Sequence, residues 1–181
     1  VARGPAWGLE RYLNHLEGTP TMANITKKTA YDRQLTGAPY GDVLMLPYRM
    51  ETNASGVLVG GDSASAVGVG DVVRLGKLPA GAKLLDSVVT ISDAFTGSST
   101  YKLGFAYCDG VDSTSVPQDD DYFVAASTAL SSVAVQRKAT TTAPVTLPKD
   151  AYLILTNAGA AQAAAGIADI LVFAQAIGIE G

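Results

Sequence analysis

The chain has little charge and few of the side chains on which most enzymes depend. Only 17% of its 181 residues are charged, against about 25% in a typical globular protein. It has one histidine, His15, and one cysteine, Cys108. A lone cysteine cannot form an internal disulfide, so the fold does not depend on an oxidising compartment. Because free thiols are usually buried and inert, we expect Cys108 to be a small, half-buried apolar residue.

Glutamate is also scarce, since the acidic residues comprise thirteen aspartates but only four glutamates. Helical bundles and coiled coils draw on Glu, Lys, Leu and Arg, which lose little side-chain freedom in a helix. This chain is instead rich in Val, Thr, Gly and Asp, which favour strands and turns. The composition argues against a helix bundle, a coiled coil and a disordered chain.

Basic residues are few and thinly spread. Thirteen Lys and Arg against seventeen acidic residues give a net charge of -4 and a pI of about 4.8. Affinity for nucleic acid comes mostly from clustered Lys and Arg that neutralise phosphates. We therefore expect no nucleic-acid partner.

The chain also lacks an uninterrupted apolar segment of the length needed to cross a membrane. The longest apolar stretch, residues 151–179, is interrupted by polar side chains: Asn157, Gln162, Asp169 and Gln175. A charge at membrane depth costs ~2.5–3.5 kcal/mol even on the lenient insertion scale. The first residues show no continuous apolar core of the signal-peptide kind. We therefore expect a soluble protein with neither a membrane span nor a signal peptide.

What is present begins with a distinct N-terminal segment, residues 1–41. An apolar stripe at i, i+3, i+4 and i+7 predicts a short amphipathic helix: Leu9, Tyr12, Leu13 and Leu16. Gly18 and Pro20 then end it. A helix of about ten residues is marginal in isolation, so it must pack on its own domain, on a neighbouring subunit or on a partner. We take Trp7 and the four stripe residues as a candidate interface on this arm.

From residue 42 onward the spacing of apolar residues changes from the helical period of 3.6 residues to the strand period of 2. Strands are predicted at 43–50, 71–75, 83–93, 101–108, 122–126, 132–137, 144–147, 151–156 and 167–179. Short strands at turn spacing predict that 42–181 form an all-β domain, a jelly-roll-like β-sandwich with a short N-terminal helical arm. Pro47 marks the first strand as an edge or a bulge. The mostly apolar strand 151–156 is expected to be central, and 158–166 is either a loop or one short helical turn.

One predicted strand carries an aromatic stripe. Its alternate residues share one face: Tyr101, Leu103, Phe105 and Tyr107. Such a stripe is typical of the inner face of a sandwich, and the alternative is a platform on which sugars stack. In the preceding strand, Leu85, Val89 and Ile91 are expected on one side.

The sequence offers no catalytic constellation. A serine triad needs a histidine base, and His15 lies on the predicted terminal helix, outside the β domain. Residues 68–71 (GVGD) do not complete a dinucleotide-binding loop, because Val73 stands where the third glycine belongs. The chain has no G-x-S-x-G, no H-E-x-x-H and no Cys/His group with zinc spacing. We therefore predict that it is not an enzyme and has no catalytic, cofactor-binding or metal-binding residues.

One acidic cluster could still carry chemistry. It comprises Asp109, Asp112, Asp119, Asp120 and Asp121. Such oxygen ligands could hold Ca²⁺, or a pair of carboxylates could serve a glycosidase. Because an EF-hand spacing is absent and adjacent side chains on an extended backbone point in different directions, we expect a solvated loop.

Three segments carry a resemblance to a known family: 73–93 (VRLGKLPAGAKLLDSVVTISD), 100–107 (TYKLGFAY) and 147–156 (LPKDAYLILT). In strand-and-turn pattern, and over roughly residues 42–179, the chain resembles the capsid cement (decoration) proteins of tailed bacteriophages. The resemblance implies a jelly-roll-type fold that binds over joints between major capsid subunits. It carries over no catalytic residues and does not cover the arm.

The leading hypothesis is therefore a structural virion protein that cements neighbouring major capsid subunits. It would be a homo-oligomer, dimer or trimer, on the outer capsid surface, assembled in the host cytoplasm. Attachment to several subunits raises effective affinity, and twenty extended residues of an arm span up to ~70 Å. The alternative is a receptor- or glycan-binding β-sandwich module of a phage fibre or tail, using exposed aromatics such as Tyr101 or Tyr107 and the Asp-rich loop.

Overall fold

The computed structural model describes residues 43–138 and 142–177. The predicted helical arm, His15 and the candidate interface residues Trp7, Leu9, Tyr12, Leu13 and Leu16 lie outside the described residues. The described part forms the strands β1 (Val43–Thr52), β2 (Val72–Leu78), β3 (Ala82–Asp93), β4 (Thr100–Tyr107), β5 (Asp119–Ala129), β6 (Ala134–Arg137), β7 (Val145–Thr146), β8 (Ala151–Ala158) and β9 (Gly166–Ala176). In these two ranges the chain forms no helix, and hence none long and apolar enough to cross a membrane.

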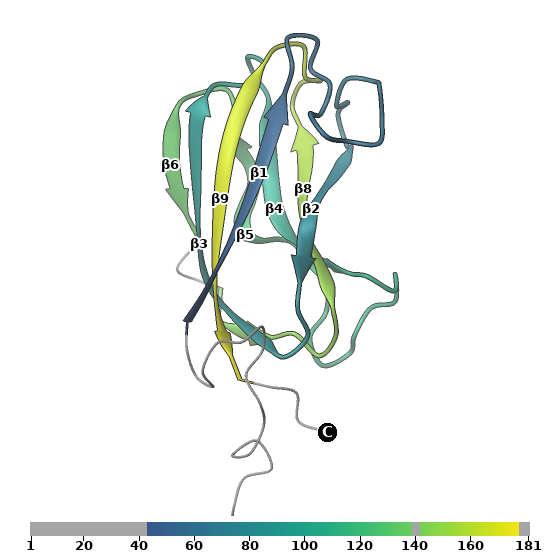
Figure 1. Cartoon of the computed structure of the whole chain (residues 1–181), viewed down its shortest axis with the longest axis vertical. Helices are drawn as coiled ribbons and strands as arrows, with labels where there is room; N and C mark the ends of the chain where they lie inside the picture. The colour runs from purple at the N-terminus through teal and green to yellow at the C-terminus, as the bar shows by residue number, and fades with distance from the viewer. Residues whose placement is uncertain (1–42, 139–141, 178–181) are drawn as a thin grey trace, which may run out of the picture.

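The strands make two antiparallel sheets packed face to face (Figure 1). One sheet has the order β1-β9-β3-β6, with the short β7 also paired to β3, and the other has the order β2-β8-β4-β5. Apart from the β4–β5 hairpin and the short β7, successive strands switch from one sheet to the other. With β7 set aside, this order is the eight-stranded jelly roll of two Greek keys. The predicted all-β jelly-roll fold is confirmed.

Several strand positions follow from the sequence as expected. β1 is an edge strand, where Pro47 lies opposite Leu171 and its missing N–H does not interrupt a central ladder. The apolar β8 is central, between β2 and β4. The segment between Ala158 and Gly166 runs as a loop, which decides between the two alternatives left open for it.

The core lies between the sheets and takes every second residue of the central strands. The aromatic stripe belongs to it: Tyr101, Leu103, Phe105 and Tyr107 are 0–3% exposed. The ring of Phe105 meets those of Tyr107 and Tyr122 edge to face, with centroids 5.9 and 5.5 Å apart. The inner-face prediction is confirmed. The sugar-stacking alternative is wrong, because buried rings present no face to a ligand.

A bulge in β3 changes which residues share a face. Leu84, Val89 and Ile91 are buried, whereas Leu85 is only half-buried. The pairing of β3 with β9 slips between Leu84 and Asp86, and the extra residue reverses the alternation along the strand. The expectation that Leu85 shares a side with Val89 and Ile91 is wrong for this reason.

A second irregularity lies between β4 and β5, over Gly104. Leu103 pairs with Val124 but Phe105 pairs with Asp119, so β5 carries several extra residues at this point. The backbone of β5 crosses so close that a Cβ on Gly104 would lie 2.1 Å from the carbonyl oxygen of Asp119. Because the obstacle is backbone rather than a flexible side chain, only glycine fits there.

We therefore expect Gly104→Ala to lower the free energy of unfolding by about 3 kcal/mol, as overpacking against an unyielding neighbour does. Gly97→Ala is the matched control, because a Cβ there meets nothing within 4 Å. That variant should stay within about 1 kcal/mol of the parent. Denaturant unfolding of the parent and the two variants checks this, and equal losses in both variants would contradict the close approach at Gly104.

Candidate functional site

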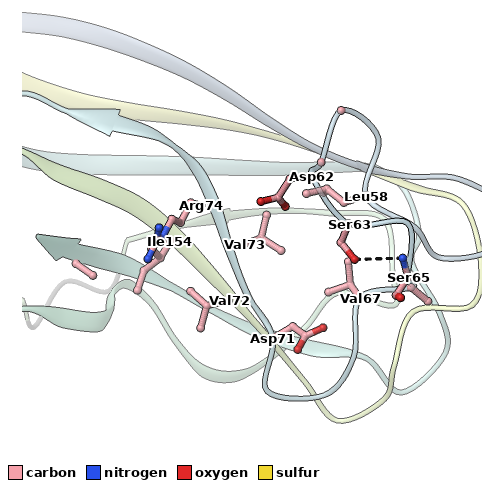
Figure 2. Close-up of a pocket in the computed structure, with 14 residues that line it drawn as sticks. Leu58, Asp62, Ser63, Ser65, Val67, Asp71, Val72, Val73, Arg74 and Ile154 are labelled. Carbon is pink, nitrogen blue, oxygen red and sulfur yellow. Dashed lines mark hydrogen bonds between the residues drawn. The ribbon is translucent and has the colours of Figure 1, made fainter. Parts of the chain in front are cut away.

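An open groove of about 760 Å³ lies between β2 and the loop that joins β1 to β2 (Figure 2). Its apolar lining comes from the loop and from two neighbouring strands: Leu58, Val67, Val72, Val73 and Ile154. Its polar lining comes from the same loop and from β2: Asp62, Ser63, Ser65, Asp71 and Arg74. The sequence pattern identifies the glycines of this region only as turn residues and does not predict the groove.

Two polar groups of the groove, those of Asp71 and Arg74, have structural partners. The carboxylate of Asp71 accepts a hydrogen bond from the N–H of Gly68 (2.7 Å), which closes a turn. The guanidinium of Arg74 lies 5.1 Å from the ring centroid of Tyr152, a cation–π contact. Among the described residues that line the groove, none is histidine, cysteine or lysine.

Two buried amide side chains, Asn157 and Gln162, hold the loop that forms one wall of the groove. Each is at most 1% exposed. Nε2 of Gln162 donates to Oδ1 of Asn157 (2.7 Å), and Nδ2 of Asn157 donates to the carbonyl of Gly68 (2.8 Å). The backbone N–H of Thr96 donates to Oε1 of Gln162 (3.2 Å). We call this pair the amide clasp, because it ties together the loops β1–β2, β3–β4 and β8–β9.

Backbone contacts fix the same loop. The N–H of Gln162 donates to the carbonyl of Val67 (2.8 Å), and the N–H of Val67 donates to the carbonyl of Gly56 (3.0 Å). Gly56 has φ +76°, and a Cβ on it would lie 2.1 Å from the carbonyl oxygen of Gln162. The loop wall is thus built on a glycine that no other residue can replace without moving the clasp.

Gln162→Ala should leave polar atoms of Asn157 and Thr96 without a partner in a buried site. We expect the free energy of unfolding to fall by about 1–3 kcal/mol, which is the cost of an unsatisfied buried group. Proteolysis within the β1–β2 loop should also become faster, since the loop loses a restraint. Thr114→Ala, at an exposed loop position, is the control. Unchanged stability and unchanged cleavage in the Gln162 variant would show that the clasp does not hold the loop.

The structure divides the acidic cluster into two groups. In the β4–β5 loop, Asp109 pairs with Lys149 (2.7 Å), and this hydrogen bond lowers the pKa of the Asp109 carboxyl. Asp112 accepts hydrogen bonds from the backbone N–H groups of Ser113 and Gln118 (2.7 Å each). The Asp109 carboxylate neutralises Lys149, and the Asp112 carboxylate accepts from backbone N–H groups of the loop. Both carboxylates therefore already have partners.

The second acidic group is at the start of β5, where the carboxylates of Asp119, Asp120 and Asp121 lie within 4.8 Å of one another. Asp120 pairs with Lys102 (2.5 Å). Burial, and next the neighbouring Asp121, raise the pKa of the Asp119 carboxyl. The group is largely exposed and carries its own counter-charge. The expectation of a solvated loop is wrong for these three residues, because they lie in β5 with their carboxylates close together. Exposed acidic groups of this kind are common without a metal ion, so the grouping alone supports neither calcium binding nor a glycosidase pair.

Two further residues with chemical potential have structural surroundings. Cys108 is half-buried, as expected from the sequence. Lys138 is a buried lysine whose ammonium group donates to the carbonyl of Thr142 (2.9 Å) and lies 4.3 Å from the ring centroid of Tyr122. Burial lowers the pKa of Lys138 and raises that of Tyr122 to about 12. The pair fastens the chain beyond β6 to β5.

Comparison with known proteins identifies the fold. No protein-family model and no curated protein matches the sequence. A chain in the capsid of Ralstonia phage GP4 is similar in structure, with a TM-score of 0.53 and 18% identity, over 81% of this chain and 93% of that one. A chain in the capsid asymmetric unit of cyanophage Pam1 has a TM-score of 0.50 and 13% identity, over 86% of this chain and 99% of that one. At these identities the likeness concerns the fold.

Proposed function

We propose that this chain is a structural protein of a bacteriophage virion that binds the outer capsid surface and cements neighbouring major capsid subunits. The observation that carries the proposal is the jelly-roll fold that it shares with chains of two phage capsids. The likeness covers 93% and 99% of those chains, so it is not confined to a local motif. On this proposal the protein is a virion component and not an enzyme, and it is assembled onto the particle in the host cytoplasm.

The structure supports the proposal physically. A protein that braces a lattice needs a rigid body and several contact surfaces, because simultaneous attachment multiplies modest affinities. The two packed sheets supply that body, and the amide clasp of Asn157 and Gln162 stiffens the loops at one end of it. The groove beside β2 is formed from that stiffened loop.

On this proposal, the N-terminal arm allows the protein to contact a capsid subunit at a distance from the β-sandwich. β1 starts at Val43, at the end of the sandwich opposite the β1–β2 loop (Figure 1). Its ten residues separate the two ends by ~33 Å at the usual rise of a strand. We propose that residues 1–41 extend from this end and that the candidate interface residues of the arm contact a capsid subunit: Trp7, Leu9, Tyr12, Leu13 and Leu16.

Deletion of residues 1–21 should weaken binding of the protein to capsids and lower the temperature at which the particle releases its genome. The reason is that the apolar stripe at Leu9, Tyr12, Leu13 and Leu16 is lost. Co-sedimentation with capsids and a thermal release assay measure the two effects. The experiment uses particles of the phage whose genome encodes the chain.

A pair of substitutions separates the stripe from the arm as a whole. Leu13→Ser with Leu16→Ser should reproduce the deletion, whereas Asn14→Ala with Glu17→Ala, off the stripe, should bind like the parent. If truncated protein decorates and stabilises capsids as well as the full chain, the arm has no such role. If the protein is missing from purified particles, the proposed function itself is wrong.

A further inference from the structure

The outer face of the β1-β9-β3-β6 sheet is apolar at its centre. Residues directly opposite one another on neighbouring strands project to the same side of a sheet. Met45 lies opposite Phe173, while Pro47 and Val88 lie on either side of Leu171. These side chains alternate with the more deeply buried residues of their strands and are therefore directed away from the core. We call this set the outer apolar face: Met45, Pro47, Val88, Leu171 and Phe173.

The other sheet differs. Its outer surface carries Arg74 and Lys77 on β2 and the ion pair between Lys102 and Asp120 on β4 and β5. An antiparallel sheet that faces water on one side normally alternates apolar inward and polar outward residues. This sheet departs from the alternation at Val72 and Ile154, which stand at outward positions and line the groove. β9 departs from that rule, because apolar residues stand at several of its outward positions. A contiguous apolar set on the outer face of a sheet indicates a surface that is covered by something.

The edges of this sheet are poorly suited to pairing with another strand. Pro47 interrupts the free edge of β1, and the opposite edge strand, β6, has only four residues. Short edge strands and edge prolines are the usual means of preventing strand addition. An association that buries the outer apolar face must therefore stack on the face and not extend the sheet.

Charges of both signs surround the apolar centre. The cations are Lys83, Arg49 and Arg137, and the anions are Glu51, Asp86 and Asp169. Arg49 pairs with Asp169 (2.8 Å) and Arg137 pairs with Asp86. An apolar centre with a polar rim is the usual anatomy of an interface between proteins. Because the rim carries three charges of each sign, most of them paired within the chain, a second copy meets it without net repulsion, whereas a partner of one charge gains no net attraction from it.

The area of the outer apolar face lies at the lower limit of the area that each partner buries in a stable dimer. Three strands of ten to twelve residues and the four-residue β6, spaced ~4.8 Å apart and rising ~3.3 Å per residue, give a flat area of roughly 500–600 Å². Side-chain relief adds to this area. Stable complexes bury about 600–1,000 Å² on each partner.

We propose that two copies of this chain associate through the outer apolar face, sheet against sheet, about a two-fold axis. The two sheets then pack ~10 Å apart, as the two sheets inside each copy do. Leu171 and Phe173 lie at the centre of the interface, and the charged rim lies around it. The inference goes beyond the proposed function and is independent of it, since it concerns the purified protein alone.

Sedimentation equilibrium of the full chain at about 50 µM tests the proposal, because standard-sized interfaces give dissociation constants of about micromolar or below and 50 µM also populates a weaker dimer. The parent should have a mass of twice 18.6 kDa. Leu171→Lys places a charge at the centre of the face and should raise the dissociation constant at least about tenfold, or about 1.4 kcal/mol. Val111→Lys, at a loop position that is 62% exposed, should leave the dimer unchanged.

Met45→Lys provides a second variant on the same face, since Met45 is 58% exposed and its replacement does not disturb the core. It should also weaken the dimer, and circular dichroism should show folded protein. Leu13→Lys, on the arm, should leave the dimer intact. A monomeric parent overturns the proposal, and so does a dimer that persists in both face variants or dissociates only in the Leu13 variant. A monomer that still decorates capsids would overturn this inference alone, whereas a dimer missing from particles would overturn only the proposed function.

Discussion

Both sheets depend on the last two strands of the chain. β9 lies between β1 and β3, and every residue of β1 pairs with it. β8 occupies the same position between β2 and β4. The first three strands of the chain therefore have no complete sheet until residues more than seventy positions later are inserted beside them. Such distant pairings carry a loop-closure cost that the buried layer between the sheets must offset.

The irregularities in β3 and β5 follow from the need to pack the buried apolar layer between the sheets. The bulge in β3 lets Leu84 and Val89 both face the core although they are an odd number of residues apart. The extra residues of β5 allow Tyr122 and Phe123 to be buried next to each other over the glycine of β4. Both irregularities interrupt the regular hydrogen bonding between strands, but they allow close packing of the apolar layer.

The two ends and the two faces of the sandwich have different characters, and this difference bears on function. One end carries loops joined by buried amides, with a groove beside them, and the opposite end is where β1 begins (Figure 1). One sheet carries a contiguous apolar set within a charged rim on its outer surface, and the other carries Arg74, Lys77 and the groove there. A molecule with several distinct surfaces and a rigid centre is suited to contact several neighbours at once, which is what the proposed function requires.

The sequence by itself determined most of the strands, the all-β class and the inward direction of the aromatic stripe, and it limited Pro47 to an edge strand or a bulge. These features are local, since the period of 2 and the missing N–H of proline act within one strand. Only the tertiary structure decided that Leu85 leaves the core face, that the five aspartates separate, and that Asn157 meets Gln162 in a buried clasp. The outer apolar face had one signal in the sequence, the apolar residues at both parities of 167–177, but its shape depends on which strands lie beside β9. Register and strand order are set by pairings between distant residues, and the period of a single strand carries no information about them.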